Sequence, residues 1–273
     1  MENAIPQQAR VVIIGGGVIG CSVAYHLTKL GWSDVLLLER KELTSGTTWH
    51  AAGLVGQLRG TRNMTMLAQY TSVLFAGLEE ETGQATGFKQ NGSISVAPDE
   101  ERFEELKRGA SMAKCFGLEV EVISPREARE LHPYLNIDDL CGAVFLPKDG
   151  QTNPIDTTRA LAQGAKMRGA CILENVKVEG VQKHQGRVTG VLTDKGEVKA
   201  EYVVNCAGLW GRQVGQMAGV NVPLHASEHF YIVTEEIGMP ANLPVLRDPN
   251  GWFYMKEDAG KLLMGCFEPK GKP

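Results

Sequence analysis

The sequence has 273 residues, of which 43% are hydrophobic and 22% are charged, and its formal net charge is −4. A chain of this length holds one large or two modest domains, and the composition is that of an ordinary globular protein. It has no basic block and no apolar run of the roughly 18 residues that a membrane helix needs. We therefore expect neither a nucleic-acid surface nor a membrane span.

Cysteine usage and the N-terminus bear on the compartment. Six cysteines are scattered without a Cys-x-x-Cys, which argues against a disulfide framework and against a zinc site. Residues 1–10 carry no hydrophobic signal core and are too short and acidic for a transit peptide. We expect a cytoplasmic location, with the mitochondrial matrix as the alternative if a leader has been removed.

The first ordered stretch predicts a strand, a tight turn and a helix. Apolar residues 11–14 run into a Gly-x-Gly-x-x-Gly, and the helix begins near Val18 and Ile19. Gly15 permits the sharp turn, and Gly17, which has no Cβ, lets a pyrophosphate approach the backbone. Gly20 allows close packing of the helix on the strand.

A second apolar run at residues 35–38 completes a strand–helix–strand unit. It ends at Glu39, nineteen residues after Gly20, followed by Arg40. A carboxylate at this position can accept hydrogen bonds from a ribose and would repel a 2′-phosphate. The pattern therefore predicts a dinucleotide site.

The segment after this unit is a loop. Residues 44–53 are small, polar and glycine-bearing, and they include Trp49 and His50. Such a loop lets the backbone lie close to a flat ligand. By base rate alone, His50 is a loop histidine with a structural role.

Further along, apolar periodicity predicts alternating helices and strands. We expect helices at 63–81, 99–116, 154–169 and 209–218, and a short helix that opens at 124–127 with a capping box formed by Ser124 and Glu127. In the first of these helices, Met66, Tyr70, Val73, Leu74, Gly77 and Leu78 form one stripe and residues 79–81 a solvated face. We expect strands at 88–97, 142–146, 171–178, 188–192, 197–200, 202–208, 229–234, 252–256 and 262–266.

These elements predict a mixed α/β chain with two interleaved domains. A Rossmann-like domain would contain residues 1–85 and 150–218, and a mostly antiparallel sheet domain would contain residues 86–149 and 219–273. A buried strand ending in Ala207 and Gly208 beside the first glycine loop would let a dinucleotide pass over it.

Taken together, four stretches of the chain resemble the D-amino-acid-oxidase-like flavoproteins, and within them the sarcosine and dimethylglycine dehydrogenase branch. They are residues 11–39, the run 47–54 with 57–59, residues 78–83, and residues 203–208 with 217–220 and 229–235. The Thr-Thr-Trp-His at 47–50 is the narrowest of these motifs, and Gln57, Leu58 and Arg59 favour the sarcosine enzymes.

The resemblance implies FAD rather than NAD, with His50 bonded covalently to the flavin and no metal. The cofactor-binding residues it implies are Gly15, Gly17, Val18, Ile19, Gly20, Glu39, Arg40, Thr47, Thr48, His50, Leu54, Val178, Ala207, Gly208 and Trp210. In such enzymes hydride passes from an N-methyl carbon to flavin N5.

The same resemblance assigns the groups around the amine substrate. His229, with Tyr254 as its partner, would take the amine proton, because histidine exchanges protons near neutral pH. Arg59 would bind the substrate carboxylate, with Arg62 or Arg247 as the alternatives. Both assignments compete with structural roles for the same side chains.

The resemblance also bears on partners and on extent. It implies an electron-transfer flavoprotein or oxygen as the electron acceptor. Relatives continue with a segment that returns to the first domain and with a folate-binding module that takes up tetrahydrofolate, so we expect this chain to be an N-terminal fragment. Two alternatives remain: another amine oxidase, acting on glycine or a D-amino acid, and a non-catalytic regulatory flavoprotein like the regulatory subunit of pyruvate dehydrogenase phosphatase.

Overall fold

The structure is a computed structural model that describes residues 5–273. Residues 1–4 of the N-terminal stretch considered above lie outside the described residues. The chain forms two compact units, each built from three stretches. Unit 1 contains residues 5–51, Gly77–Thr86 and Asn153–Ala226, and unit 2 contains Ala52–Ala76, Gly87–Thr152 and Ser227–Pro273.

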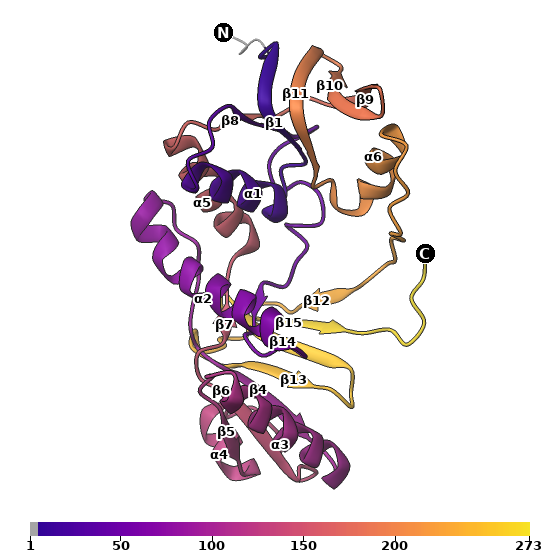
Figure 1. The fold of residues 1–273 in the computed structure, drawn as a ribbon. Coiled ribbons are helices and arrows are strands. Elements are labelled where there is room, and N and C mark those ends of the chain that lie inside the picture. The colour runs from indigo at the N-terminus through magenta and orange to yellow at the C-terminus, as the bar shows by residue number, and fades with distance from the viewer. Residues whose placement is uncertain (1–4) are drawn as a thin grey trace. The chain divides into compact units, whose positions relative to one another are not determined.

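Unit 1 is built on a six-stranded sheet with the order β8-β2-β1-β11-β10-β9. Figure 1 labels β8, β1, β11, β10 and β9 of this sheet. Its strands are β1 (Gln8–Ile14), β2 (Val35–Leu38), β8 (Cys171–Leu173), β9 (Val178–His184), β10 (Arg187–Thr193) and β11 (Gly196–Asn205). The first four strands in that order are parallel, and β10 and β9 extend the sheet antiparallel. The sequence placed one strand at 171–178, but the chain leaves the sheet after Leu173 and Asn175 adopts a left-handed φ of 58°.

Helices cover both faces of this sheet. They are α1 (Val18–Lys29), α5 (Pro154–Met167), α6 (Gly211–Met217) and the short 3-10 helix η1 (Gly208–Trp210). Val12 and Ile14 pack with Val214 of α6 on one face, and residues 11–14 of β1 are all buried. A central parallel strand buried on both sides is what the uninterrupted apolar run predicts.

Unit 2 is built on a seven-stranded sheet with the order β12-β15-β14-β13-β4-β6-β5. Its strands are β4 (Ser93–Ala97), β5 (Glu121–Ile123), β6 (Gly142–Leu146), β12 (Tyr231–Val233), β13 (Val245–Asp248), β14 (Phe253–Asp258) and β15 (Lys261–Cys266). Neighbours are antiparallel except β13 and β4. The sequence analysis missed β13, because this four-residue strand does not alternate: Val245 and Leu246 are both buried.

Two further helices and a small ribbon also belong to unit 2. They are α3 (Glu100–Cys115), α4 (Pro125–Leu131), β3 (Leu54–Val55) and β7 (Gly150–Gln151). The expected capping box at the start of α4 is present, with Ser124 and Glu127 as its two members. Residues 52–76 were placed in the first domain from the sequence, but they cluster with unit 2, where β3 pairs with β7.

The helix α2 (Arg62–Thr82) corrects one expectation and qualifies another. Met66, Tyr70 and Val73, which belong to the predicted apolar stripe, are 53%, 45% and 74% exposed. Glu81, expected on a solvated face, accepts hydrogen bonds from the hydroxyl of Tyr25 and pairs with Arg168. Periodicity therefore identified the stripe without showing whether other chain covers it.

Within residues 5–273, no helix has the length and apolar character needed to cross a membrane. The same residues contain no group of three or more His, Cys, Asp or Glu side chains arranged to hold a metal ion.

Candidate functional site

The glycine loop joins β1 to α1 with backbone packed directly on backbone. Gly15 has a φ of +112°, and a Cβ there would lie 2.4 Å from the carbonyl oxygen of Cys206. A Cβ at Gly20 would lie 1.9 Å from the carbonyl oxygen of Gly15. Both positions therefore require glycine, and the start of α1 presents backbone rather than side chains.

Glu39 holds this loop in place. Its Oε2 accepts a hydrogen bond from the N–H of Gly16 at 2.7 Å, and its Oε1 accepts one from the N–H of Lys41 at 2.9 Å. The hydroxyl oxygen of Thr48 accepts the N–H of Val18 at 3.0 Å. Because a carboxylate can accept about four hydrogen bonds, Glu39 retains capacity for a ribose hydroxyl.

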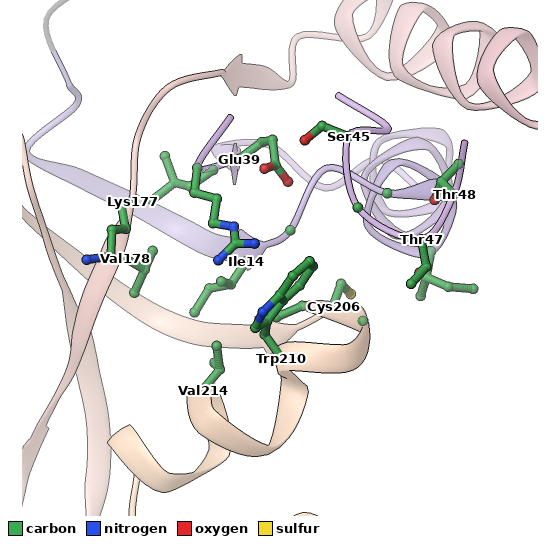
Figure 2. A pocket seen from close by; sticks show the side chains of 18 of the residues that line it. Ile14, Glu39, Ser45, Thr47, Thr48, Lys177, Val178, Cys206, Trp210 and Val214 are labelled. Atoms are coloured by element: carbon green, nitrogen blue, oxygen red, sulfur yellow. The ribbon is translucent and has the colours of Figure 1, made fainter. Parts of the chain in front are cut away.

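A cavity of about 250 Å³ opens beside the loop within unit 1, and we call it the cradle. Figure 2 shows Glu39, Thr48, Val178 and Trp210 around it, carried by separate segments. The predicted cofactor residues that line it are Gly15, Gly17, Val18, Ile19, Glu39, Arg40, Thr47, Thr48, Val178, Ala207, Gly208 and Trp210.

The sequence analysis missed one wall of the cradle. Gln213, Val214 and Met217 of α6 line it together with Trp210. Residues 210, 214 and 217 repeat at helical spacing after the Ala-Gly, and this spacing was the signal that could have found the wall.

Side-chain chemistry makes two other parts of the cradle distinctive. The guanidinium carbon of Arg40 lies 3.9 Å from the centroid of the Trp210 ring, which is a cation–π stack. Burial raises the pKa of the Cys206 thiol to about 11, so this part of the wall is uncharged at neutral pH.

These residues fit the adenosine and pyrophosphate of a dinucleotide. The loop has no side chain where a phosphate would approach, and a helix N-terminus attracts anions. The apolar wall at Val178 and the ring of Trp210 suit a flat base, and Glu39 suits a ribose.

Three predicted cofactor residues do not line the cradle: Gly20, which packs against the backbone of Gly15, His50 and Leu54. His50 is exposed, and its ring centroid lies 3.8 Å from that of Trp49 with the planes tilted by 36°. Leu54 belongs to β3 of unit 2 and lines a different cavity. The covalent bond at His50 stays a prediction.

That second cavity, of about 450 Å³, lies within unit 2, and we call it the arginine cavity. Arg59 and Arg247 line it together with Ser93 and Asp149. The backbone of Arg59 is held by buried Thr65, whose Oγ1 accepts the Arg59 N–H at 3.1 Å and donates to the Arg59 carbonyl oxygen at 3.2 Å. The alternative Arg62 does not line the cavity.

Asp149 is a buried carboxylate in the wall of the arginine cavity, only 5% exposed. Its Oδ1 accepts the N–H of Gln57 at 2.8 Å, and its Oδ2 accepts the hydroxyl of Ser93 at 2.7 Å. Burial raises the pKa of Asp149, while these hydrogen bonds and the charges of Arg59 and Arg247 act in the opposite direction.

The predicted proton-transfer pair lies around one aromatic ring. The centroid of Phe267 lies 5.2 Å from that of His229 and 5.5 Å from that of Tyr254. His229 is exposed, and its Nδ1 lies 3.2 Å from Oε2 of Glu268. Tyr254 is buried, which raises its pKa, and it stands opposite Arg247 on the neighbouring strand.

A family model described as FAD dependent oxidoreductase matches residues 10–272. The chain is 45% identical over 273 residues to human mitochondrial sarcosine dehydrogenase, covering 98% of this chain and 30% of that protein. It is 42% identical over 274 residues to the mouse mitochondrial pyruvate dehydrogenase phosphatase regulatory subunit, covering 99% and 31%. The chain therefore spans about a third of the length of these relatives.

The fold has solved counterparts. The crystal structure of L-proline dehydrogenase from P. horikoshii superposes with a TM-score of 0.91 at 28% identity, covering 98% of this chain and 71% of that one. The mixed α/β architecture expected from the sequence is confirmed by the two sheets and by this match.

Proposed function

The chain belongs to the FAD-dependent oxidoreductase family, and on that premise we propose that it carries out FAD-dependent oxidative demethylation of an N-methyl amino acid such as sarcosine or dimethylglycine. The observation that carries the substrate class is the arginine cavity, where two guanidinium groups line one space in unit 2. Paired arginines suit a carboxylate, because the guanidinium fork binds it through two hydrogen bonds.

Residues of the cradle would hold the cofactor. The glycine loop and the start of α1 would bind the pyrophosphate, and Glu39 would bind the adenosine ribose. His50 is the proposed covalent anchor. Bound FAD would supply the two-electron acceptor for the substrate's C–H bond.

Side chains of unit 2 would prepare the amine. The lone pair on nitrogen must be free to assist hydride loss, so a base has to take the ammonium proton. We assign this role to His229, with Tyr254 as its partner across Phe267. Glu268, beside Nδ1 of His229, stabilises the imidazolium that would form.

The substrate carboxylate would bind to Arg59 and Arg247 together. From the sequence, Arg59 was the first choice and Arg247 an alternative, but both line the same cavity. The position of Arg247 opposite Tyr254 favours its participation, because directly opposite residues of two antiparallel strands lie on the same sheet face.

A non-catalytic role is the second candidate. The 42% identity to a phosphatase regulatory subunit is close to the 45% identity to a sarcosine dehydrogenase, so overall similarity does not separate the two. An amine oxidase acting on glycine or a D-amino acid would keep the same cradle and arginines. The electron acceptor, the folate module and the compartment stay predictions.

Two measurements test the covalent flavin bond and separate the oxidative function from the regulatory role. After acid denaturation of the FAD-loaded protein, flavin fluorescence should stay with the polypeptide and disappear in His50→Ala, whereas flavin that washes away contradicts the covalent bond. Without oxygen, sarcosine or dimethylglycine should bleach the flavin absorbance; an oxidised spectrum after prolonged incubation with both would favour the regulatory role.

The proton-transfer assignment has its own test. His229→Gln should slow flavin reduction by about 100-fold, because general base catalysis contributes roughly 10²–10⁴-fold. His184→Gln, a change at another exposed histidine on β9, is the matched control. Reduction at the parent rate in His229→Gln would remove the assignment.

A further inference from the structure

The arginine cavity contains a carboxylate that binding of a simple anion does not explain. Two arginines alone would suit any carboxylate, yet Asp149 shares the cavity with them and has no salt bridge within 4.0 Å among the described residues. An ionised side chain that is 5% exposed is costly unless it has a partner. Its two hydrogen bonds, from Gln57 and Ser93, leave lone pairs of both oxygens unused.

Gly56 defines the space between the opposite charges. A Cβ built on Gly56 would lie 3.4 Å from Oδ2 of Asp149 and 3.5 Å from Nη1 of Arg59. Both are ordinary contact distances, so a ligand atom at this position would touch the carboxylate and the guanidinium together. A small zwitterion carries opposite charges close enough to place one on each group.

From this arrangement we propose that Asp149 binds the ammonium group of a zwitterionic α-amino acid whose carboxylate lies on Arg59 and Arg247. The inference rests on the proposed function and sharpens it, because it requires a substrate that arrives with a positively charged nitrogen close to a carboxylate. The ammonium N–H would donate to a free lone pair of Asp149 before the base takes the amine proton, and the ligand would supply the partner that this carboxylate lacks.

The two zwitterion ends account for the cavity's charge. Two guanidinium groups and one carboxylate carry a net charge of +1. A dicarboxylate would place a second negative charge beside Asp149, which costs free energy in a partly desolvated site. A carboxylate lacking the cation would leave Asp149 unpaired, so the cavity selects against both.

The test compares two ligands of nearly the same shape. Sarcosine carries a secondary ammonium where methoxyacetate carries an ether oxygen, and only the first can donate to Asp149. Their dissociation constants are measured by calorimetry on the FAD-loaded chain with the flavin reduced beforehand, so that no turnover occurs. We expect the parent protein to bind sarcosine at least about tenfold more tightly than methoxyacetate.

Asp149→Asn should abolish this preference, and methoxyacetate should bind at least as tightly as in the parent. Asp138→Asn, at an exposed carboxylate of unit 2 outside the cavity, is the matched control and should keep the preference. Gly56→Ala retains both charges but fills the space beside them. It should therefore raise the dissociation constant of sarcosine by about fivefold or more. This second variant keeps the proposal testable should Asp149→Asn fold poorly.

The outcomes separate this inference from the proposed function. If sarcosine reduces the oxidised flavin while Asp149→Asn leaves the ratio of the two dissociation constants unchanged, or Gly56→Ala leaves the dissociation constant of sarcosine unchanged, the role of Asp149 is wrong and the function stands. If the parent protein neither binds sarcosine nor is reduced by it, both fail.

Discussion

The cradle and the arginine cavity are built in opposite ways. The cradle depends on the absence of side chains and of charge. At Gly15 and Gly20 backbone packs directly on backbone, and the Cys206 thiol in the wall is uncharged at neutral pH. The arginine cavity depends on charges that are present, Arg59, Arg247 and Asp149, brought from distant parts of the sequence. Added side-chain volume should therefore impair FAD binding in the cradle, whereas removal of a charged group should impair ligand binding in the arginine cavity.

The largest effect should come from adding one methyl group to the glycine loop. Gly20→Ala places a Cβ 1.9 Å from the carbonyl oxygen of Gly15, and neither backbone segment can move without disturbing β1. We expect a loss of about 3 kcal/mol in the free energy of unfolding, together with loss of FAD from the purified protein.

Denaturant unfolding and the ratio of flavin to protein absorbance measure the two effects. Gly77→Ala is the matched control, because a Cβ at Gly77 meets no atom within 4 Å and alanine is the better helix former. A Gly20→Ala protein that keeps its FAD and its stability would contradict the claim that the cradle does not tolerate added side-chain volume.

Removal of a guanidinium should affect the substrate side alone. Arg247→Ala should raise the KM for sarcosine by about 100-fold, since a charge-assisted bidentate pair contributes roughly 1.5–3 kcal/mol. FAD content should stay at the parent level. Arg126→Ala, on the exposed face of α4, controls for the loss of one positive charge and should leave the KM unchanged.

A KM for Arg247→Ala within a factor of two of the parent would show that the cavity does not bind substrate. Arg59→Lys is a finer test, because it keeps the positive charge and loses the forked hydrogen-bond donors of the guanidinium. The KM should rise less than in Arg247→Ala but more than in Arg126→Ala.

Charge in the cavity should also cost stability in the absence of substrate. Because the folded-state pKa of Asp149 is raised above its unfolded value, its contribution to stability is fully present at low pH and is lost as the pH rises through the folded pKa. Asp149→Asn does not titrate and should gain stability relative to the parent as the pH rises from about 4 to 7, by an amount on the order of 1 kcal/mol.

Urea unfolding at a series of pH values checks this gain. The Ser93 hydroxyl can rotate to accept a hydrogen bond from the new amide, so the packing is preserved. If Asp149→Asn is less stable than the parent throughout this range, the carboxylate has a structural role that outweighs the cost of burying its charge.

The smallest effect concerns the thiol in the cradle wall. With its pKa raised to about 11, Cys206 should react with iodoacetamide at pH 7.5 more slowly than the exposed Cys115 and Cys266, because the thiolate is the nucleophile. Peptide mass spectrometry after timed alkylation measures the three rates. A fast reaction at Cys206 would show that this wall carries charge.

The same contrast explains which parts could be predicted from sequence. The cradle was foreseeable because Gly15, Gly20 and Glu39 lie within one strand–helix–strand unit, where spacing alone sets their geometry. The role of Asp149 could not be predicted from the sequence, because an Asp-Gly pair after a strand is an ordinary turn. Its partner Ser93 lies 56 residues away, and only the sheet brings them together.

Helix α2 shows a different limit. Its apolar stripe was correctly identified by spacing, but Val73 is 74% exposed while Leu78 of the same stripe is fully buried. Periodicity describes one helix, whereas burial depends on what packs against it. The strand β13 was missed for a related reason, because both faces of so short a strand are shaped by its neighbours.

The scattered origin of the arginine cavity has an evolutionary consequence. Its polar lining comes from a loop, two strands and a turn, none of which contributes to the glycine loop. Replacement of Gly56, Ser93 or Asp149, one at a time, would therefore alter the lining of the arginine cavity while the cradle stays intact. Proteins named for sarcosine oxidation and for phosphatase regulation align with this one chain along nearly its whole length, as such stepwise divergence would leave them.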